Sequence, residues 1–136
     1  MRKKEQAFTL LEIMLVVTII ALLLAAAIKF MAPNVDIAKR VRVAGDIQAI
    51  KTSLLAYQGI NGFYPTTEQG LQALVTAPST PPQPARWQQF MEQVPTDPWG
   101  NPYVYKCPGQ KNPTRYDLYS AGPDRTPDTQ DDDWGK

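Results

Sequence analysis

Hydrophobic residues follow three patterns along the chain, and the first is an almost unbroken apolar run over residues 8–28. A helix of about 20 apolar residues is long enough to cross the hydrocarbon core of a bilayer. Arg2, Lys3 and Lys4 precede the run, and basic residues mark the flank of a membrane helix that stays in the cytoplasm. The pattern predicts a single-pass membrane helix over residues 8–32, after a short basic segment of residues 1–7.

The second pattern is a helical stripe beyond Pro33, because the apolar positions there recur at intervals of four and three residues. The members of the stripe are Val43, Ile47, Ile50, Leu54 and Tyr57. It predicts an amphipathic helix over about residues 34–58, which Gly59 and the Asn61-Gly62 pair bring to an end. Pro33 lacks an N–H and is expected to bend or locally melt the helix.

The third pattern consists of short apolar segments separated by turn residues. Thr66 and Gln69 have the spacing of a capping box, which predicts a short helix that ends before Pro78. Residues 78–84 are rich in proline and read as a surface loop. The apolar residues Trp87, Phe90 and Met91 are expected to fasten this loop to the rest of the domain.

Two further segments have the alternation of strands, at residues 103–106 and 116–120, and a turn cluster at residues 97–102 precedes the first. These elements predict an α+β fold in which a long N-terminal helix, half membrane anchor and half amphipathic, packs on a small antiparallel sheet. A long loop completes a domain of residues 33–136.

Composition excludes several kinds of chemistry. The chain has no histidine, which removes Ser-His-Asp and Cys-His catalysis and histidine-ligated metals. Cys107 is the single cysteine, so no intramolecular disulfide forms, and we expect it to be a buried small residue. The net charge is only +1, and no basic cluster interleaved with aromatic residues lies outside residues 1–7, which argues against nucleic-acid binding.

Glu12 is the costly feature of the apolar run. A carboxylate in such a segment costs about 2.5–3.5 kcal/mol on insertion scales and therefore indicates a function. A cleaved secretory signal ending near Ala25 would have a shorter apolar region. A plain signal anchor explains the length but not Glu12. A glutamate that snorkels to the membrane surface remains the simple alternative.

The C-terminal segment carries a cluster of carboxylates between Gly and Pro residues: Asp124, Asp128, Asp131, Asp132 and Asp133. Calcium takes six to eight oxygen ligands from carboxylates and carbonyls in flexible loops. The spacing and flanks are not those of an EF-hand. On composition alone, a calcium site and a solvated acidic tail are both open.

The segment AFTLLEIML, residues 7–15, resembles the class III signal of type IV pilins and type II secretion pseudopilins. The resemblance implies that a prepilin peptidase cuts between Ala7 and Phe8, after which the new amine of Phe8 is methylated. It also implies that Glu12 pairs with the Phe8 amine of a neighbouring subunit during assembly. Ala7 stands where the family usually has Gly, and Lys29 where relatives usually have Pro.

The segments YPTTEQGLQAL, residues 64–74, and DPWGNPYVY, residues 97–105, together with the Asp-rich loop, resemble the major pseudopilin family of type II secretion. The resemblance implies a calcium-binding C-terminal loop. Its ligands would be the side chains of Asp124, Asp131 and Asp132 and the carbonyls of Ala121 and Thr129. Calcium would be structural. Arg125 replaces a frequent Gly, and Asp133 replaces an apolar residue.

The same resemblance implies a structural subunit and not an enzyme. The chain would sit in the bacterial inner membrane with its C-terminal domain in the periplasm and polymerise into the helical filament of a periplasmic pseudopilus, which drives export of folded proteins across the outer membrane. Its partners would be copies of itself, the prepilin peptidase, minor pseudopilins, the inner-membrane assembly platform and the secretin.

Three other functions are alternatives to this one. A type IV pilin or competence-type pilin shares the N-terminal third but usually carries a disulfide that Cys107 alone cannot form. A membrane-anchored periplasmic hydrolase would use Asp124 and Asp131 as an acid/base pair. A calcium-dependent binding module would use the Asp-rich loop.

Overall fold

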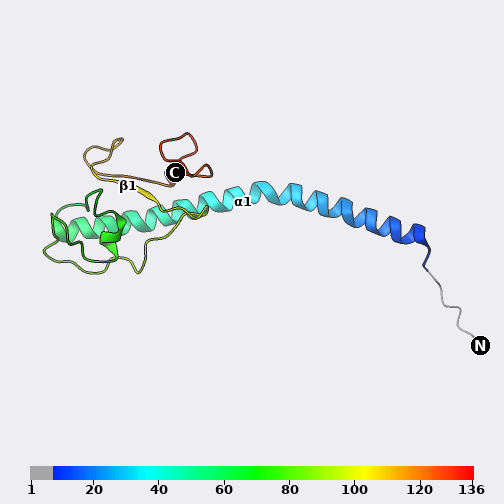
Figure 1. The fold of residues 1–136 in the computed structure, drawn as a ribbon, viewed down its shortest axis with the longest axis horizontal. Helices are drawn as coiled ribbons and strands as arrows, with labels where there is room; N and C mark the ends of the chain where they lie inside the picture. Colours follow the sequence, from blue (N-terminus) through cyan, green and yellow to red (C-terminus); the bar gives the residue numbers. More distant parts are fainter. Residues whose placement is uncertain (1–7) are drawn as a thin grey trace, which may run out of the picture. The chain divides into compact units, whose positions relative to one another are not determined.

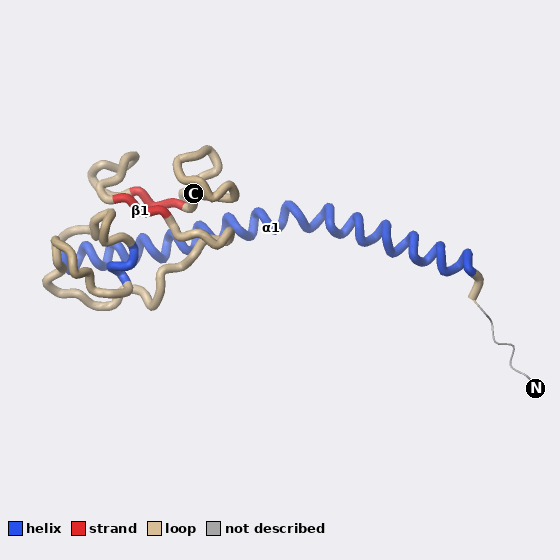
Figure 2. The backbone as a smooth tube through the Cα atoms, viewed as in Figure 1, coloured by secondary structure: helices blue, strands red, loops and turns tan. Residues whose placement is uncertain are grey.

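The chain folds into one long helix followed by a loop-rich domain with a small sheet (Figures 1 and 2). The structure, a computed structural model, describes residues 8–136, with backbone alone for residues 32–34. The predicted leader, residues 1–7, lies outside the described residues. The chain divides into two compact units, one ending at Ala38 and the other comprising Lys39–Lys136. The domain bounds proposed from the sequence stay predictions.

Helix α1 spans Leu10–Asn61, and its residues up to Ala38 belong to the first unit. The helix assignment is unbroken at position 33, so the local melting expected there is not found. Among the described residues, α1 is the one helix long and apolar enough to cross a membrane. Its apolar side chains are uncovered in this unit; Leu10 is 80% and Ile28 71% exposed.

The second part of α1 builds the core of the second unit. The five residues of the predicted stripe are at most 1% exposed, which confirms the amphipathic helix: Val43, Ile47, Ile50, Leu54 and Tyr57. The helix ends three residues later than the predicted position 58, at Asn61. Gly62 takes a left-handed φ of 85° and its N–H donates to the Gln58 carbonyl at 2.7 Å, which ends the helix there instead.

The capping box at Thr66 and Gln69 is confirmed. The Thr66 N–H donates to Gln69 Oε1 at 3.1 Å, and the Gln69 N–H donates to Thr66 Oγ1 at 3.2 Å. The helix that follows is a single 3-10 turn, η1, over Leu71–Leu74. Gln69 Nε2 also donates to the carbonyl of Thr80 at 2.7 Å, so the buried glutamine ties the proline-rich loop to η1.

The predicted apolar patch does fasten the loop. Trp87 Nε1 donates to the Ala73 carbonyl at 2.9 Å, and the N–H groups of Phe90 and Met91 both donate to the Leu74 carbonyl. The side chains of all three patch residues pack, partly buried, against the core. The connection between η1 and the sheet is therefore fixed at several points although it contains no regular element.

The sheet has two antiparallel strands, β1 over Val104–Lys106 and β2 over Asp117–Tyr119. Tyr105 pairs with Leu118, and both side chains are buried in the core. Both strands are shorter than predicted. Ser120, expected in the second strand, instead forms an isolated bridge with Asp133. Cys107, expected to be buried, is half-buried, and its Sγ lies 3.6 Å from the Arg115 carbonyl.

Candidate functional site

The first candidate site is the start of α1. Phe8 precedes the helix and is 76% exposed, while Ala7 lies outside the described residues. Thr9 caps the helix, because its carbonyl and Oγ1 both accept the Glu12 N–H, at 3.1 and 3.3 Å. Within residues 8–136, no hydrogen bond or ion pair involves the Glu12 carboxylate. The helix therefore offers an uncommitted carboxylate on an otherwise apolar surface.

The second candidate site is the Asp-rich loop that follows β2. Its two ends meet, since Ser120 and Asp133 exchange a pair of backbone N–H···O bonds of 2.9 Å each. Residues 121–132 are thereby closed into a compact loop. Ala121 and Gly122 at its base are buried, whereas Asp124 near its tip is exposed.

Asp131 organises the inside of this loop. Its Oδ2 accepts the Asp124 N–H at 3.1 Å and its Oδ1 accepts the Thr129 hydroxyl at 2.6 Å. The Thr129 hydroxyl, followed by the Asp124 N–H, lowers the pKa of Asp131, because both bonds favour the charged carboxylate. The Asp124 side chain bonds within the loop, where its Oδ1 accepts the Thr126 N–H at 2.8 Å.

Asp132 differs from its neighbours because its Oδ1 is buried and has no hydrogen-bond partner. A buried oxygen without a protein partner is costly, and a bound water or cation would satisfy it. Asp132 Oδ1 is therefore an oxygen of the loop that no protein donor occupies.

Gly122 allows the chain to close tightly around Asp131. Its φ is 68°, in the left-handed region, and a Cβ there would collide with the Asp131 carbonyl and lie 2.9 Å from Asp131 Oδ2. At position 122 only glycine therefore fits without displacing Asp131. Arg125 also has a left-handed φ, of 61°, a conformation that glycine adopts without the strain of a Cβ.

The remaining aspartates of the loop are committed elsewhere. Asp128 Oδ2 lies 3.1 Å from Lys106 Nζ, and its Oδ1 accepts the Tyr119 hydroxyl at 2.9 Å. The bond from Lys106, followed by that from Tyr119, lowers the pKa of Asp128. Asp133 Oδ1 accepts the Gly135 N–H at 2.9 Å. Of the adjacent pair, Asp132 has a buried carboxylate oxygen without a partner, whereas one oxygen of Asp133 is held by Gly135.

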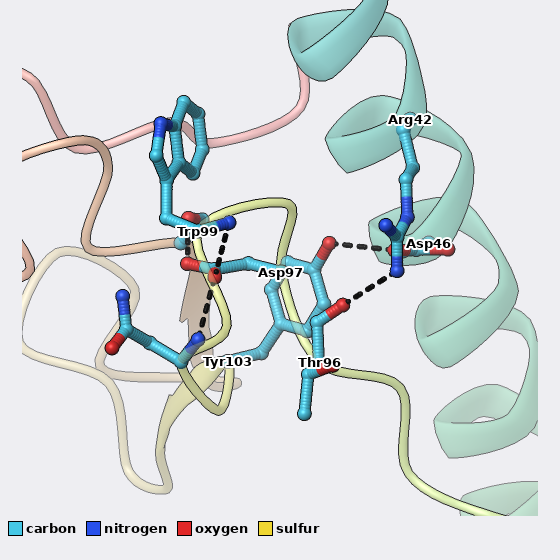
Figure 3. Close-up of polar contacts among 8 residues, drawn as sticks. Arg42, Asp46, Thr96, Asp97, Trp99 and Tyr103 are labelled. Atoms are coloured by element: carbon cyan, nitrogen blue, oxygen red, sulfur yellow. Dashed lines mark hydrogen bonds and ion pairs between the residues drawn. The ribbon is translucent and has the colours of Figure 1, made fainter.

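A polar network anchors the base of the loop (Figure 3). Asp97 is 2% exposed, and its Oδ1 accepts the N–H groups of Trp99 and Asn101 at 3.0 and 2.7 Å. Its Oδ2 accepts the Ser120 hydroxyl at 2.7 Å, and Ser120 Oγ in turn accepts the Gly122 N–H at 3.1 Å. The turn before β1 thereby holds the first residues of the loop.

The same turn is tied to α1 within the second unit. Arg42 Nη2 donates to the Thr96 carbonyl at 3.0 Å, and the Tyr103 hydroxyl donates to Asp46 Oδ2 at 2.8 Å (Figure 3). Sequence reasoning recognised the turn but not the roles of Asp46 and Asp97. An aspartate that begins an Asp-Pro-x-Gly turn is a signal that would have found Asp97.

The loop fits a cation in its chemistry but is not a preassembled cage. Its donors are hard oxygens, one of them buried without a partner, which suits calcium. Over the described residues 8–136, however, no group of three or more acidic, Cys or His side chains is positioned to hold a metal. The ligand set Asp124, Asp131 and Asp132 stays a prediction.

Comparison with known proteins decides the family. A family model described as type II secretion system protein G matches residues 31–134, and a prokaryotic N-terminal methylation motif matches residues 2–28. The chain belongs to the type II secretion system protein G family. The match covers most of the second unit and confirms the resemblance seen in the sequence.

Relatives in the type II secretion system protein G family align with this chain over nearly its whole length. The type II secretion system core protein G of Pseudomonas aeruginosa is 43% identical over 134 residues, covering 97% of this chain and 93% of the relative. That of Escherichia coli K12 is 42% identical over 136 residues, covering 97% and 92%. The crystal structure of the major pseudopilin of enterohaemorrhagic Escherichia coli superposes with a TM-score of 0.69 at 42% identity, covering 74% of this chain and 85% of that chain. A pilin of another system is not favoured.

Proposed function

We infer that the chain is a structural subunit that polymerises into the periplasmic pseudopilus of a type II secretion system. The observation that carries this inference is the protein G match over residues 31–134 joined to a methylation motif over residues 2–28. The subunit drives export of folded proteins by forming the filament and performs no chemistry of its own. The prepilin peptidase, the minor pseudopilins, the assembly platform and the secretin are its partners in this proposal.

The apolar part of α1 supports an inner-membrane location with the C-terminal domain in the periplasm. Large hydrophobic side chains along residues 10–31 are 47–80% exposed. Such a surface is stable when covered by lipid or by the same surface of other subunits. The helix is thus suited to leave the bilayer for a filament core without changing its secondary structure.

Glu12 would favour transfer of the helix from the bilayer into the filament. Cleavage after Ala7 would expose an amine on Phe8, one helical turn from the carboxylate of Glu12. In a medium of low dielectric, an unpaired carboxylate is strongly unfavourable, whereas a carboxylate beside an ammonium group is compensated. Two staggered copies satisfy both charges, because the Glu12 of one meets the Phe8 amine of the other.

The experiment compares Glu12→Leu, Glu12→Gln and the parent chain in cells that assemble surface-visible filaments on overproduction. We expect both variants to fractionate with the inner membrane, to be cleaved, and to form no filaments. Filaments from Glu12→Gln alone would mean that polarity suffices and that the charge pair is not the assembly signal. Filaments from both variants would contradict the role of Glu12.

We also propose that the Asp-rich loop binds one structural calcium ion. Asp132, whose Oδ1 has no partner, would provide one ligand, and Asp131, Asp124 and the carbonyls of Ala121 and Thr129 would provide the others. When bound, calcium would offset the repulsion between the carboxylates and hold the loop closed over Gly122.

Thermal unfolding of the detergent-solubilised full chain, with calcium and with a chelator, tests the site. Binding to the folded state alone stabilises it by about 2.7 kcal/mol at a free concentration 100-fold above Kd. We expect Asp132→Asn to abolish the calcium-dependent shift in melting temperature and the matched variant Asp133→Asn to retain most of it. A parent chain whose melting temperature ignores calcium would refute the proposal.

A further inference from the structure

A cavity of about 350 Å³ in the second unit gathers positive charge from three separate segments. Lys51 reaches it from α1, Lys111 from the connection between β1 and β2, and Lys136 from the C-terminal segment. The other residues that line it are neutral: Asn112, Tyr116, Leu118 and Trp134. Three lysines that line one cavity give it a positive potential, which attracts an anion.

Two carboxylates close to Lys111 already have other partners. Asp117 is buried and accepts the N–H groups of Gln110, Lys111 and Asn112 at 2.6, 2.8 and 3.0 Å. Asp128 is paired with Lys106. Across residues 8–136 the ion pairs within 4.0 Å are Arg42–Asp46 and Lys106–Asp128, and neither includes a lysine of the cavity.

Lys111 is held in place in advance of any ligand. Its Nζ lies 4.0 Å from the centre of the Trp134 ring, and that ring is stacked on Tyr119 with 4.5 Å between centroids. Its backbone N–H is fixed by Asp117. A side chain that is ordered at both ends loses little entropy when an anion binds, which raises the affinity of the site.

Neutral donors complete the lining. Burial raises the pKa of Tyr116 above its ordinary value, so its hydroxyl is a neutral hydrogen-bond donor at neutral pH. Lysine ammonium groups are common binders of phosphate as point charges, and hydroxyl donors add direction. We propose that this cavity binds a phosphate group, either of a free phosphomonoester or of an anionic lipid. The proposal does not depend on filament assembly.

Glycerol 3-phosphate is a suitable probe because it is the phosphate unit shared by both sources. Calorimetric titration into the full chain in non-ionic detergent, at fixed calcium and ionic strength, measures its affinity. We expect Lys111→Gln to weaken binding about tenfold, the loss typical of one hydrogen bond to a charged group. Lys39→Gln is the matched control, because Lys39 also lies over a tryptophan, Trp99, at 5.5 Å, but outside the cavity.

Nanodiscs distinguish the two sources. The full chain is reconstituted in phosphatidylcholine with or without phosphatidylglycerol, and the fluorescence of Trp134 is isolated by difference from Trp134→Phe. A change in Trp134 fluorescence that requires both phosphatidylglycerol and Lys111 identifies lipid as the source of the phosphate group. If the change appears only when glycerol 3-phosphate is added, the source is free phosphomonoester.

Three results would overturn the proposal. The first is that the parent chain neither binds glycerol 3-phosphate nor gives a lipid-dependent change in fluorescence. The second is that Lys39→Gln and Lys111→Gln weaken binding equally, which would mean that net charge and not the cavity determines the affinity. The third is that the parent chain fails to bind while Lys111→Gln blocks filament formation, which would mean that an acidic segment of a second copy occupies the cavity.

Discussion

Replacing Asp97 by alanine removes the acceptor on which the base of the Asp-rich loop depends. In the folded chain its carboxylate, which is 2% exposed, accepts the N–H groups of Trp99 and Asn101 and the hydroxyl of Ser120. The variant leaves three donors without a partner where water has little access. At about 1 kcal/mol for each, the free energy of unfolding should fall by about 3 kcal/mol.

Near-ultraviolet circular dichroism of the full chain in detergent measures this loss, because all three tryptophans, Trp87, Trp99 and Trp134, lie in the second unit. For a unit of about 100 residues, 1 kcal/mol corresponds to about 4–8 °C in Tm, so Asp97→Ala should unfold roughly 12–24 °C below the parent. Since Gly122 is held through Ser120, calcium should also stabilise this variant less than the parent.

Asp97→Asn is the matched variant. Its amide oxygen can still accept the N–H groups of Trp99 and Asn101, and its amide nitrogen can donate to the Ser120 hydroxyl oxygen. Its loss should therefore be less than half that of Asp97→Ala. If Asp97→Ala unfolds within about 1 kcal/mol of the parent, or if the two variants are equally destabilised, the network does not hold the loop and the reasoning fails.

Two further predictions concern single residues. Arg125→Gly should raise the free energy of unfolding by about 1 kcal/mol, because glycine adopts a φ of 61° without the strain of a Cβ; a lower melting temperature at fixed calcium would contradict this. For Asp117, burial raises the pKa, but the N–H groups of Lys111, Gln110 and Asn112 outweigh it, so the pKa is lower in the folded than in the unfolded chain. Its stabilisation is therefore present above the unfolded pKa and lost as the pH falls through the folded one; Asp117→Asn should flatten the acid limb of a pH–stability curve, and an unchanged limb would count against it.

The elements that follow from local pattern were predictable from the sequence. The stripe from Val43 to Tyr57 is buried as its spacing predicts, and the capping box of Thr66 and Gln69 forms with both of its bonds. Element ends were less predictable: α1 runs to Asn61, and Ser120 leaves the second strand to pair with Asp133. The end of α1 is set by the left-handed backbone of Gly62, and the end of β2 by the pairing of Ser120 with Asp133.

The candidate site divides in the same way. Glu12 stands out by composition, since a carboxylate in an apolar run is costly wherever it lies. The Asp-rich segment also stands out, but composition does not distinguish Asp132 from Asp133. In the structure the two differ in burial and contacts, because Asp132 has a buried oxygen without a partner whereas Asp133 accepts the Gly135 N–H; that Asp132 is the ligand stays a prediction.

By itself the sequence determined the membrane-length helix, its carboxylate, the helical core stripe and the family, because each depends on residue type and spacing along one segment. Only the tertiary structure decided how Asp97 holds Ser120, why Gly122 must be glycine, and that Lys51, Lys111 and Lys136 line one cavity. These residues come from segments far apart in the chain. Their contacts depend on chain closure and packing, which no local pattern records.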